Sequence, residues 1–172
     1  MIKKTILAGV AMATFATSGL ANMDNFKNTS LQLGSSAIDL ESSNNVGYGY
    51  NVGLEQIIFK GNSFDFCWGG DLQGITEKKF DYTSTDIYVT LGYKINEKMK
   101  PYLILGAAGL QLDDANFIGF EYGLGLKYQL INYVAIDTKV ITSTVSESSS
   151  GLLELDISKV LLNLEFNFRS SK

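Results

Sequence analysis

The sequence contains no histidine, and this absence removes several kinds of chemistry at once. Serine–histidine–aspartate triads, histidine-ligated metals and the commonest general base all need an imidazole. A single cysteine, Cys67, excludes an internal disulfide. There is only one proline, Pro101, and no apolar run reaches the roughly 18 residues that a transmembrane helix needs. Histidine-dependent enzymes, disulfide-stapled folds and helical membrane spans are therefore excluded.

The first residues have the pattern of a secretory signal peptide. A short basic start is followed by an apolar run of small residues to about Ala16, and small residues precede Ala21. The pattern predicts cleavage after Ala21, which removes residues 1–21 and leaves residues 22–172 as one domain. The two lysines of the start leave with it, so 14 − 2 = 12 basic residues remain against 18 acidic ones. No basic stripe remains to neutralise phosphates, and we expect no nucleic-acid partner.

A period-two alternation fills nearly all of the chain after residue 26. Its clearest example is Ile118–Tyr128, where every second residue is apolar or aromatic and the residues between are glycine, glutamate or lysine. Alternate side chains of a strand point to opposite faces. The segment is therefore a strand with one apolar, aromatic face and one face of glycine and charge.

Eight segments of this kind predict eight strands. They are Thr29–Asp39, Val46–Phe59, Ser63–Ile75, Thr83–Ile95, Lys100–Leu112, Ile118–Tyr128, Tyr133–Val145 and a last strand that ends at Phe168. The fifth is apolar on both faces, so the sequence does not decide which of its side chains point into the barrel. In the last strand, the apolar residues before Ser158 fall on the opposite parity to those from Val160 onward. A bulge near Ser158–Lys159 would reconcile the two halves.

The apolar face contacts either lipid or a protein core. A soluble periplasmic barrel that binds a ligand, or a sandwich, would turn this face inward. Two features favour lipid: the other face is rich in glycine, as a narrow lumen requires, and aromatic residues gather near the ends of the apolar face. The connections after the odd-numbered strands are polar and mostly longer than the others, which is typical of outer-membrane barrels. We therefore predict an all-β fold, an eight-stranded antiparallel up-and-down transmembrane β-barrel.

Several segments resemble the small outer-membrane β-barrel family, which includes the OmpA-type and OmpX-type eight-stranded barrels and the opacity-like porins. Gly123–Tyr128 followed by Val134–Lys139 looks like the end of these barrels, and Pro101–Gly109 resembles their preceding strand. The run Leu162–Phe168 is similar to the C-terminal signal that the barrel assembly machinery reads, although residues 169–172 follow it. The resemblance implies a bacterial outer-membrane location, with the lipid bilayer and the assembly machinery as partners.

Charged residues on the inward face carry the remaining functional information. The predicted lumen-facing polar network consists of Glu55, Asp71, Asp86, Lys94, Glu121, Lys127, Asp137, Lys139 and Glu165, with Asp65 as a further inward acid. We expect Lys127 and Lys139 to pair with inward acids such as Glu121, Asp137 or Glu165. Eight strands leave an interior just wide enough for side chains to fill it, which predicts a polar plug. The excess of seven acids over three lysines is the one feature that supports a narrow cation-favouring pore instead.

No other pattern in the chain points to chemistry. Cys67 has no histidine partner and is interpreted as a small residue of the inward face. The acids Glu41, Asp113 and Asp114 are interpreted as solvated loop residues rather than as a cation site. We therefore expect no catalytic residues, no cofactor and no metal, and a structural or surface-interaction role. The alternatives are a small porin and a soluble periplasmic ligand-binding barrel.

Overall fold

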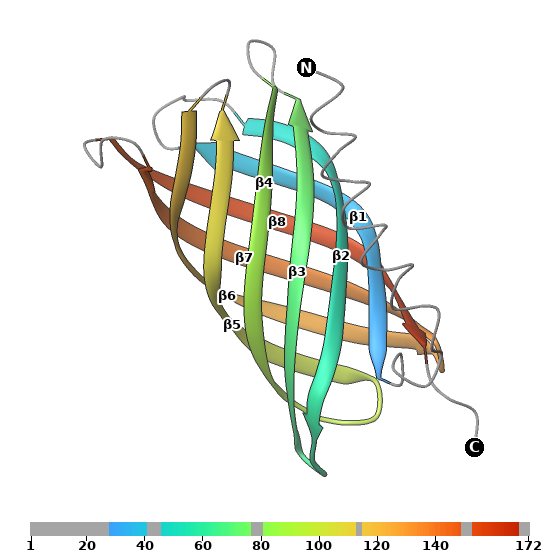
Figure 1. Cartoon of the computed structure of the whole chain (residues 1–172). Coiled ribbons are helices and arrows are strands. Elements are labelled where there is room, and N and C mark those ends of the chain that lie inside the picture. Colours follow the sequence, from blue (N-terminus) through green and yellow to red (C-terminus); the bar gives the residue numbers. More distant parts are fainter. Residues whose placement is uncertain (1–27, 41–45, 77–80, 113–114, 149–152, 169–172) are drawn as a thin grey trace, which may run out of the picture.

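In a computed structural model, the chain forms a single β-sheet that closes on itself (Figure 1). The structure describes residues 28–40, 46–76, 81–112, 115–148 and 153–168. The predicted signal peptide and its cleavage site, and most of the longer connections, lie outside these residues. No helix within the described residues is long and apolar enough to cross a membrane.

Eight antiparallel strands follow one another around the barrel in chain order, and the last pairs with the first. They are β1 (Thr29–Leu40), β2 (Val46–Lys60), β3 (Phe64–Thr76), β4 (Asp81–Tyr93), β5 (Met99–Leu112), β6 (Ala115–Ile131), β7 (Val134–Glu147) and β8 (Glu154–Phe168). The predicted fold class and all eight predicted strands are confirmed. The bounds differ by at most three residues, and β6 is longer than predicted by three residues at each end, because its pairing with β5 and β7 continues to Ala115 and Ile131.

The strands are strongly staggered. Following the paired residues from Thr29 across all eight strands leads back to β1 at Asp39. The stagger around the closed barrel is therefore 39 − 29 = 10 residues. A stagger of this size requires the strands to tilt by about 35–45° from the barrel axis. Residues at one height in the lumen therefore come from widely different positions in their strands. We call the end with the β2–β3, β4–β5 and β6–β7 connections the turn end and the opposite end the loop end.

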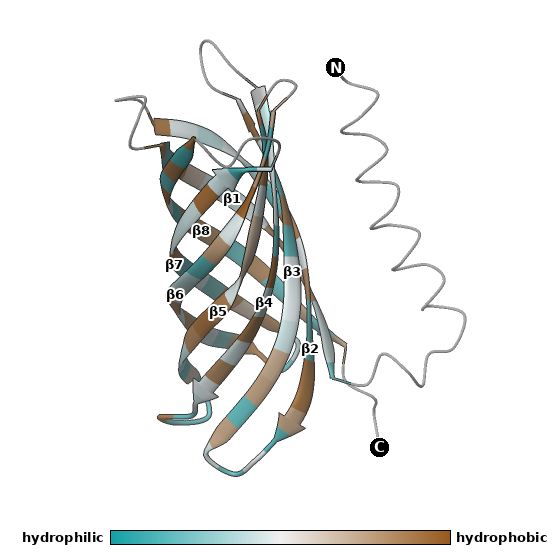
Figure 2. Ribbon diagram, turned by 60° about the vertical axis from the view of Figure 1, so that its left-hand side comes forward, coloured by the Kyte–Doolittle hydropathy of each residue, from teal (hydrophilic) through white to brown (hydrophobic). Residues whose placement is uncertain are grey.

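Over most of its height the barrel is apolar outside and largely polar inside, as the alternation predicts, although Ile104, Ile141 and Leu161 pack with the rings of Tyr88 and Tyr102 in the lumen. The exposed apolar side chains form a band, the belt, whose members include Leu33, Val52, Trp68, Val89, Leu91, Leu103, Leu105, Leu124, Leu126, Val140, Val160, Leu162 and Leu164. Figure 2 shows the resulting change of hydropathy from residue to residue along the strands. The facing of β5 is now fixed, because Leu103 and Leu105 point outward and Tyr102 and Ile104 are buried inside.

Near the loop end this polarity is reversed. The lumen there holds an apolar cluster made of Ile38, Leu40, Ile75, Tyr82, Ala108, Leu110, Phe117, Val145 and Ile157. Many of the outward side chains around it are polar, such as Asp39, Thr85, Asp156 and Ser158. We call this part of the barrel, the apolar cluster with the strand segments around it, the collar. It has the layout of a water-soluble barrel.

The predicted bulge near Ser158–Lys159 is wrong. The pairing of β8 with β1 and with β7 runs without a shift through this stretch. Register shifts occur instead at Ile57/Phe59 in β2 and at Gln129/Ile131 in β6, both near the turn end. The apolar residues before Ser158 point into the lumen, as Lys159 does. Their environment is different because they belong to the collar.

Candidate functional site in the barrel lumen

The lumen between the turn end and the apolar cluster holds three lysines, and each is the centre of a group of polar side chains. The lysine nearest the turn end is Lys127 on β6. Its Nζ lies 2.5 Å from Glu55 Oε1 and 2.6 Å from Glu165 Oε2. It also lies 5.5 Å from the centre of the Tyr102 ring, within the range of a cation–π contact. The Tyr102 hydroxyl donates a hydrogen bond of 2.5 Å to Asp137, which adds this acid to the group.

The second group surrounds Lys139 on β7, which is fully buried. Its Nζ donates to Asp71 at 2.7 Å, to Gln32 at 2.8 Å and to the Tyr88 hydroxyl at 2.5 Å. The same nitrogen lies 4.4 Å from the centre of the Tyr88 ring. All three donor positions of the ammonium group are therefore used, on residues from β1, β3 and β4.

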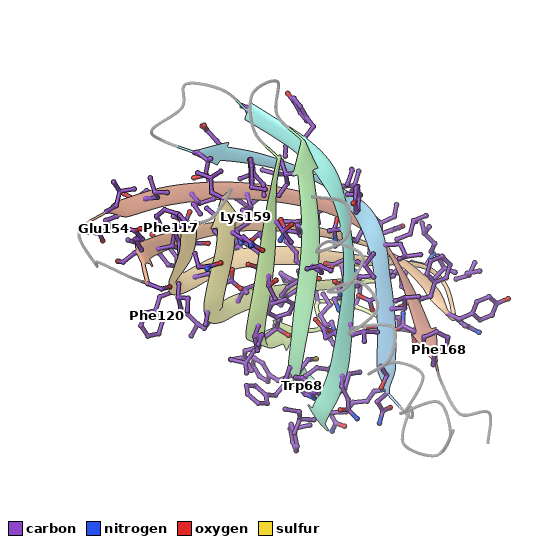
Figure 3. The ribbon with its side chains drawn as sticks, turned by 45° about the horizontal axis from the view of Figure 1, so that its top comes forward. Trp68, Phe117, Phe120, Glu154, Lys159 and Phe168 are labelled. Atoms are coloured by element: carbon purple, nitrogen blue, oxygen red, sulfur yellow. The ribbon has the colours of Figure 1, made fainter. Side chains whose placement is uncertain are left out.

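The third group surrounds Lys159 on β8, next to the apolar cluster on its turn-end side. Its Nζ lies 2.5 Å from Asp86 and 3.4 Å from Glu121, and it donates to Ser84 at 3.2 Å. Gln73 donates a further hydrogen bond of 2.5 Å to Asp86. Figure 3 labels Lys159 together with Phe117, which belongs to the apolar cluster.

A fourth, more open group lies at the turn end. Lys94 lies 2.7 Å and Lys100 lies 3.4 Å from the carboxylate of Asp65, and both lysines are partly exposed. Of the predicted network, Lys94 is the residue that lies at this rim rather than deep in the lumen.

Glycines on the inward face make room for the two large lumen side chains. A Cβ atom at Gly69 would lie 2.8 Å from the ring of Tyr88, and one at Gly125 would collide with the ring of Tyr102. Both contacts would be closer than two carbon atoms tolerate, so the tyrosine rings would have to move. The two tyrosines can therefore cross the lumen and reach Lys139 and Asp137, because their register partners on the neighbouring strands, Gly69 and Gly125, carry no side chain.

The structure gathers the predicted lumen residues into these groups, but the sequence interpretation missed two lysines. Lys159 was hidden by the assumed bulge, and Lys100 was not assigned to the interior. With them the inward charges are seven acids and five lysines, so the expected excess of acids is smaller. Of the expected pairs, Lys127 with Glu165 is present. Lys139 binds Asp71 instead of an acid on a neighbouring strand, because the stagger brings β3 to its height.

The groups close the lumen. A water-filled channel would leave lumen-facing polar side chains partly exposed, yet seven of them have an exposed fraction of 0%. They are Gln32, Asp71, Gln73, Asp137, Lys139, Ser143 and Lys159. Cys67 also faces inward and is buried. Among the described residues, no group of three or more cysteine, aspartate or glutamate side chains is arranged to hold a metal ion.

Comparison with known proteins gives the fold and nothing finer. No protein-family model and no curated protein matches the sequence. Among solved structures, the attachment invasion locus protein Ail of Yersinia pestis is 16% identical with a TM-score of 0.58, and covers 83% of this chain and 99% of its own. Neisserial surface protein A is 13% identical with a TM-score of 0.58, over 83% of this chain and 98% of its own. The outer-membrane enzyme PagL is 14% identical with a TM-score of 0.52, over 80% of this chain and 99% of its own.

These neighbours are small barrels of the outer-membrane type. The predicted architecture is therefore confirmed, and the location of the neighbours agrees with the predicted outer-membrane location. Because one of them is an enzyme, the shared fold does not decide between a catalytic and a non-catalytic role.

Proposed function

We propose that this chain is a non-conducting, non-enzymatic outer-membrane barrel that holds its loop end above the bilayer for contact with other molecules. The observation that carries the proposal is the collar. Its outer face is largely polar, with Val46, Tyr48, Ile118 and Phe120 as exposed apolar side chains among the polar ones. This outer face and the apolar interior are suited to water, whereas the belt is suited to lipid. A barrel with this division extends beyond the membrane as a rigid continuation of its strands.

The filled lumen supports the non-conducting part of the proposal. An ion that crosses the barrel would have to pass three buried lysine groups and then the apolar cluster. Separating a buried ion pair leaves charges without compensation, which is strongly unfavourable. The porin alternative rested on an excess of inward acids, and Lys159 and Lys100 reduce that excess.

The missing histidine supports the non-enzymatic part, because this chain cannot form a histidine-dependent nucleophile–base pair. The soluble periplasmic barrel is disfavoured by the belt, whose leucine and aromatic side chains would stand in water. Contiguous apolar surface of this extent is rare on soluble monomers.

Two measurements test the proposal. Purified protein in planar bilayers should give no discrete conductance steps, and steps that persist in repeated preparations would contradict the closed lumen. Single cysteines should react with a membrane-impermeant thiol reagent at the collar, as in Ser158→Cys, and not in the belt, as in Leu124→Cys. Native Cys67 is 1% exposed and serves as an internal unreactive site. Equal labelling of the two variants in vesicles would contradict the division at the collar.

A further inference from the structure

The turn end of the barrel has the opposite charge to the rest of the outer surface. Apart from the three deeply buried lysines Lys127, Lys139 and Lys159, every lysine among the described residues lies there: Lys60 and Lys98 are exposed, and Lys94 and Lys100 belong to the partly exposed group around Asp65. With Asp65 and Glu97 the net charge of this end is 4 − 2 = +2. At the collar, by contrast, the exposed charged side chains of the described strands are acids, namely Asp39, Glu154 and Asp156. The barrel is therefore cationic at one end and anionic at the other.

The lysines at the turn end are held on a connected platform. The Nζ atom of Lys94 donates a hydrogen bond of 2.7 Å to the carbonyl of Gly61, and its backbone N–H donates one of 2.8 Å to Ser63. These bonds join the β4–β5 turn to the β2–β3 turn. The side chain of Asn96 accepts from the backbone of Lys98 at 2.8 Å and so orders the β4–β5 turn itself. We call residues 60–63 and 94–100 the turn platform.

Apolar side chains next to the lysines continue the belt to the turn platform. Ile58 is 59% exposed, Phe59 is 63% exposed and Ile95 is 58% exposed. In a bilayer these side chains reach the boundary between acyl chains and headgroups. The exposed lysines Lys60 and Lys98 then lie at the level of the lipid phosphates, because long side chains keep their charge in the polar layer.

We propose that the turn platform binds anionic phospholipid headgroups, so that the barrel collects anionic lipid around its turn end. The inference rests on the proposed function, which places the belt in the bilayer. Charge complementarity favours this occupant, since an ammonium group binds phosphate as a point charge. A lysine at an anionic membrane surface contributes about 1 kcal/mol, which corresponds to about fivefold enrichment. Solvent and salt reduce this factor, and we expect roughly two- to fivefold for the platform.

The chain contains an intrinsic fluorescent probe that can report whether anionic lipid gathers near the turn platform. Trp68 is the only tryptophan in the sequence, and it is 49% exposed on the outer face of β3. On the same strand, Trp68 lies three residues from Asp65, and Asp65 pairs with Lys60 of the turn platform. The full-length protein is inserted into vesicles in which brominated phosphatidylglycerol or brominated phosphatidylcholine is the quencher at equal mole fraction. Stronger quenching of Trp68 by the anionic lipid measures its enrichment near the platform.

The variants separate a local platform from the overall charge of the chain. Lys60→Gln/Lys98→Gln should remove the preference, and salt at about 1 M should weaken it in the parent protein. The control Asp39→Asn/Glu154→Gln shifts the net charge by two units in the opposite direction at the collar. A preference set by the overall charge of the chain would strengthen in this control, whereas a preference set by the turn platform stays unchanged. Equal quenching by both lipids in the parent, or an unchanged preference in the lysine variant, would overturn the proposal. Absence of quenching by either lipid would show that Trp68 is outside the bilayer, and would overturn the membrane placement as well.

Discussion

Along β8, the inward side chains change between Lys159 and Ile157 from a mostly charged and polar set, Glu165, Asn163 and Lys159 with Leu161 among them, to an apolar one. The outward side chains change from apolar to polar between Val160 and Ser158. The strand is continuous and its pairing is unbroken. The belt region and the collar thus share one backbone geometry and differ only in which side chains face which way. Alternation shows that two faces differ, but it does not show what either face touches.

The comparison also separates two ways of filling a lumen. In the belt region the interior is held mainly by directional contacts around Lys127, Lys139 and Lys159, with a smaller apolar cluster of Tyr88, Tyr102, Ile104, Ile141 and Leu161 between them. In the collar it is held by close packing of apolar side chains. Four substitutions, each with a matched control, test this division, and their expected effects decrease from a lumen lysine to a single lumen hydroxyl.

Removal of a lumen lysine should have the largest effect. Lys159→Met keeps the length of the side chain but leaves Asp86 and Glu121 buried without a cation. Breaking a buried pair in this way costs about 3–5 kcal/mol of unfolding free energy. Denaturant unfolding followed by Trp68 fluorescence measures the loss. The control Lys60→Met, on an exposed side chain, should stay within about 0.5 kcal/mol of the parent. Similar losses in the two variants would mean that water reaches the lumen.

Truncation of a collar residue should come next. Leu110→Ala removes a buried side chain from the apolar cluster and should cost about 2–5 kcal/mol, because it also leaves a cavity. Leu105→Ala on the same strand faces lipid, which fills the space. It should cost only the transfer of the lost carbons, roughly 0.8 kcal/mol for each. The same unfolding assay compares them. A larger loss at Leu105 than at Leu110 would argue against a packed collar.

A charge on the outer face should discriminate between the two regions most directly. Leu124→Arg places a cation in the belt and should cost about 2–4 kcal/mol if the residue lies near the bilayer midplane. Ser158→Arg places the same cation on the collar, where it meets water, and should change stability little. Folding yield into vesicles, read from heat-modifiable migration on a gel, reports both. Equal yields for the two variants would mean that the boundary has been placed wrongly.

The smallest effect is expected from loss of one hydroxyl in the lumen. Tyr88→Phe removes an acceptor of Lys139 but keeps the ring over the ammonium group. The loss of one hydrogen bond should cost about 0.5–1.5 kcal/mol. Tyr122→Phe, on the exposed face of β6, is the matched control and should change less. If the two variants have the same unfolding midpoint, the Tyr88 hydroxyl does not contribute to holding Lys139.

The sequence allowed the strands, the closed barrel and most of the lumen residues to be predicted, because alternation is a local property. It did not allow the partner of Lys139 to be predicted, because Asp71 meets it through the stagger of four strands. Lys159 could have been found by counting back in steps of two from Glu165 through Asn163. The apolar residues beyond it suggested a change of parity, because alternation alone does not distinguish a change of facing from a change of environment.

The pairing of β1 with β8 has a consequence for how the molecule is made. Thr29 lies opposite Phe168, so the first strand of the barrel meets its partner only when the last strand has been synthesised. Until then the sheet has two open edges with unpaired backbone groups, and such edges invite pairing with other chains. Contacts this distant in the chain are also slow to form, since the loop entropy is lost before the contact is gained. The unfinished chain therefore depends on protection from aggregation throughout its export.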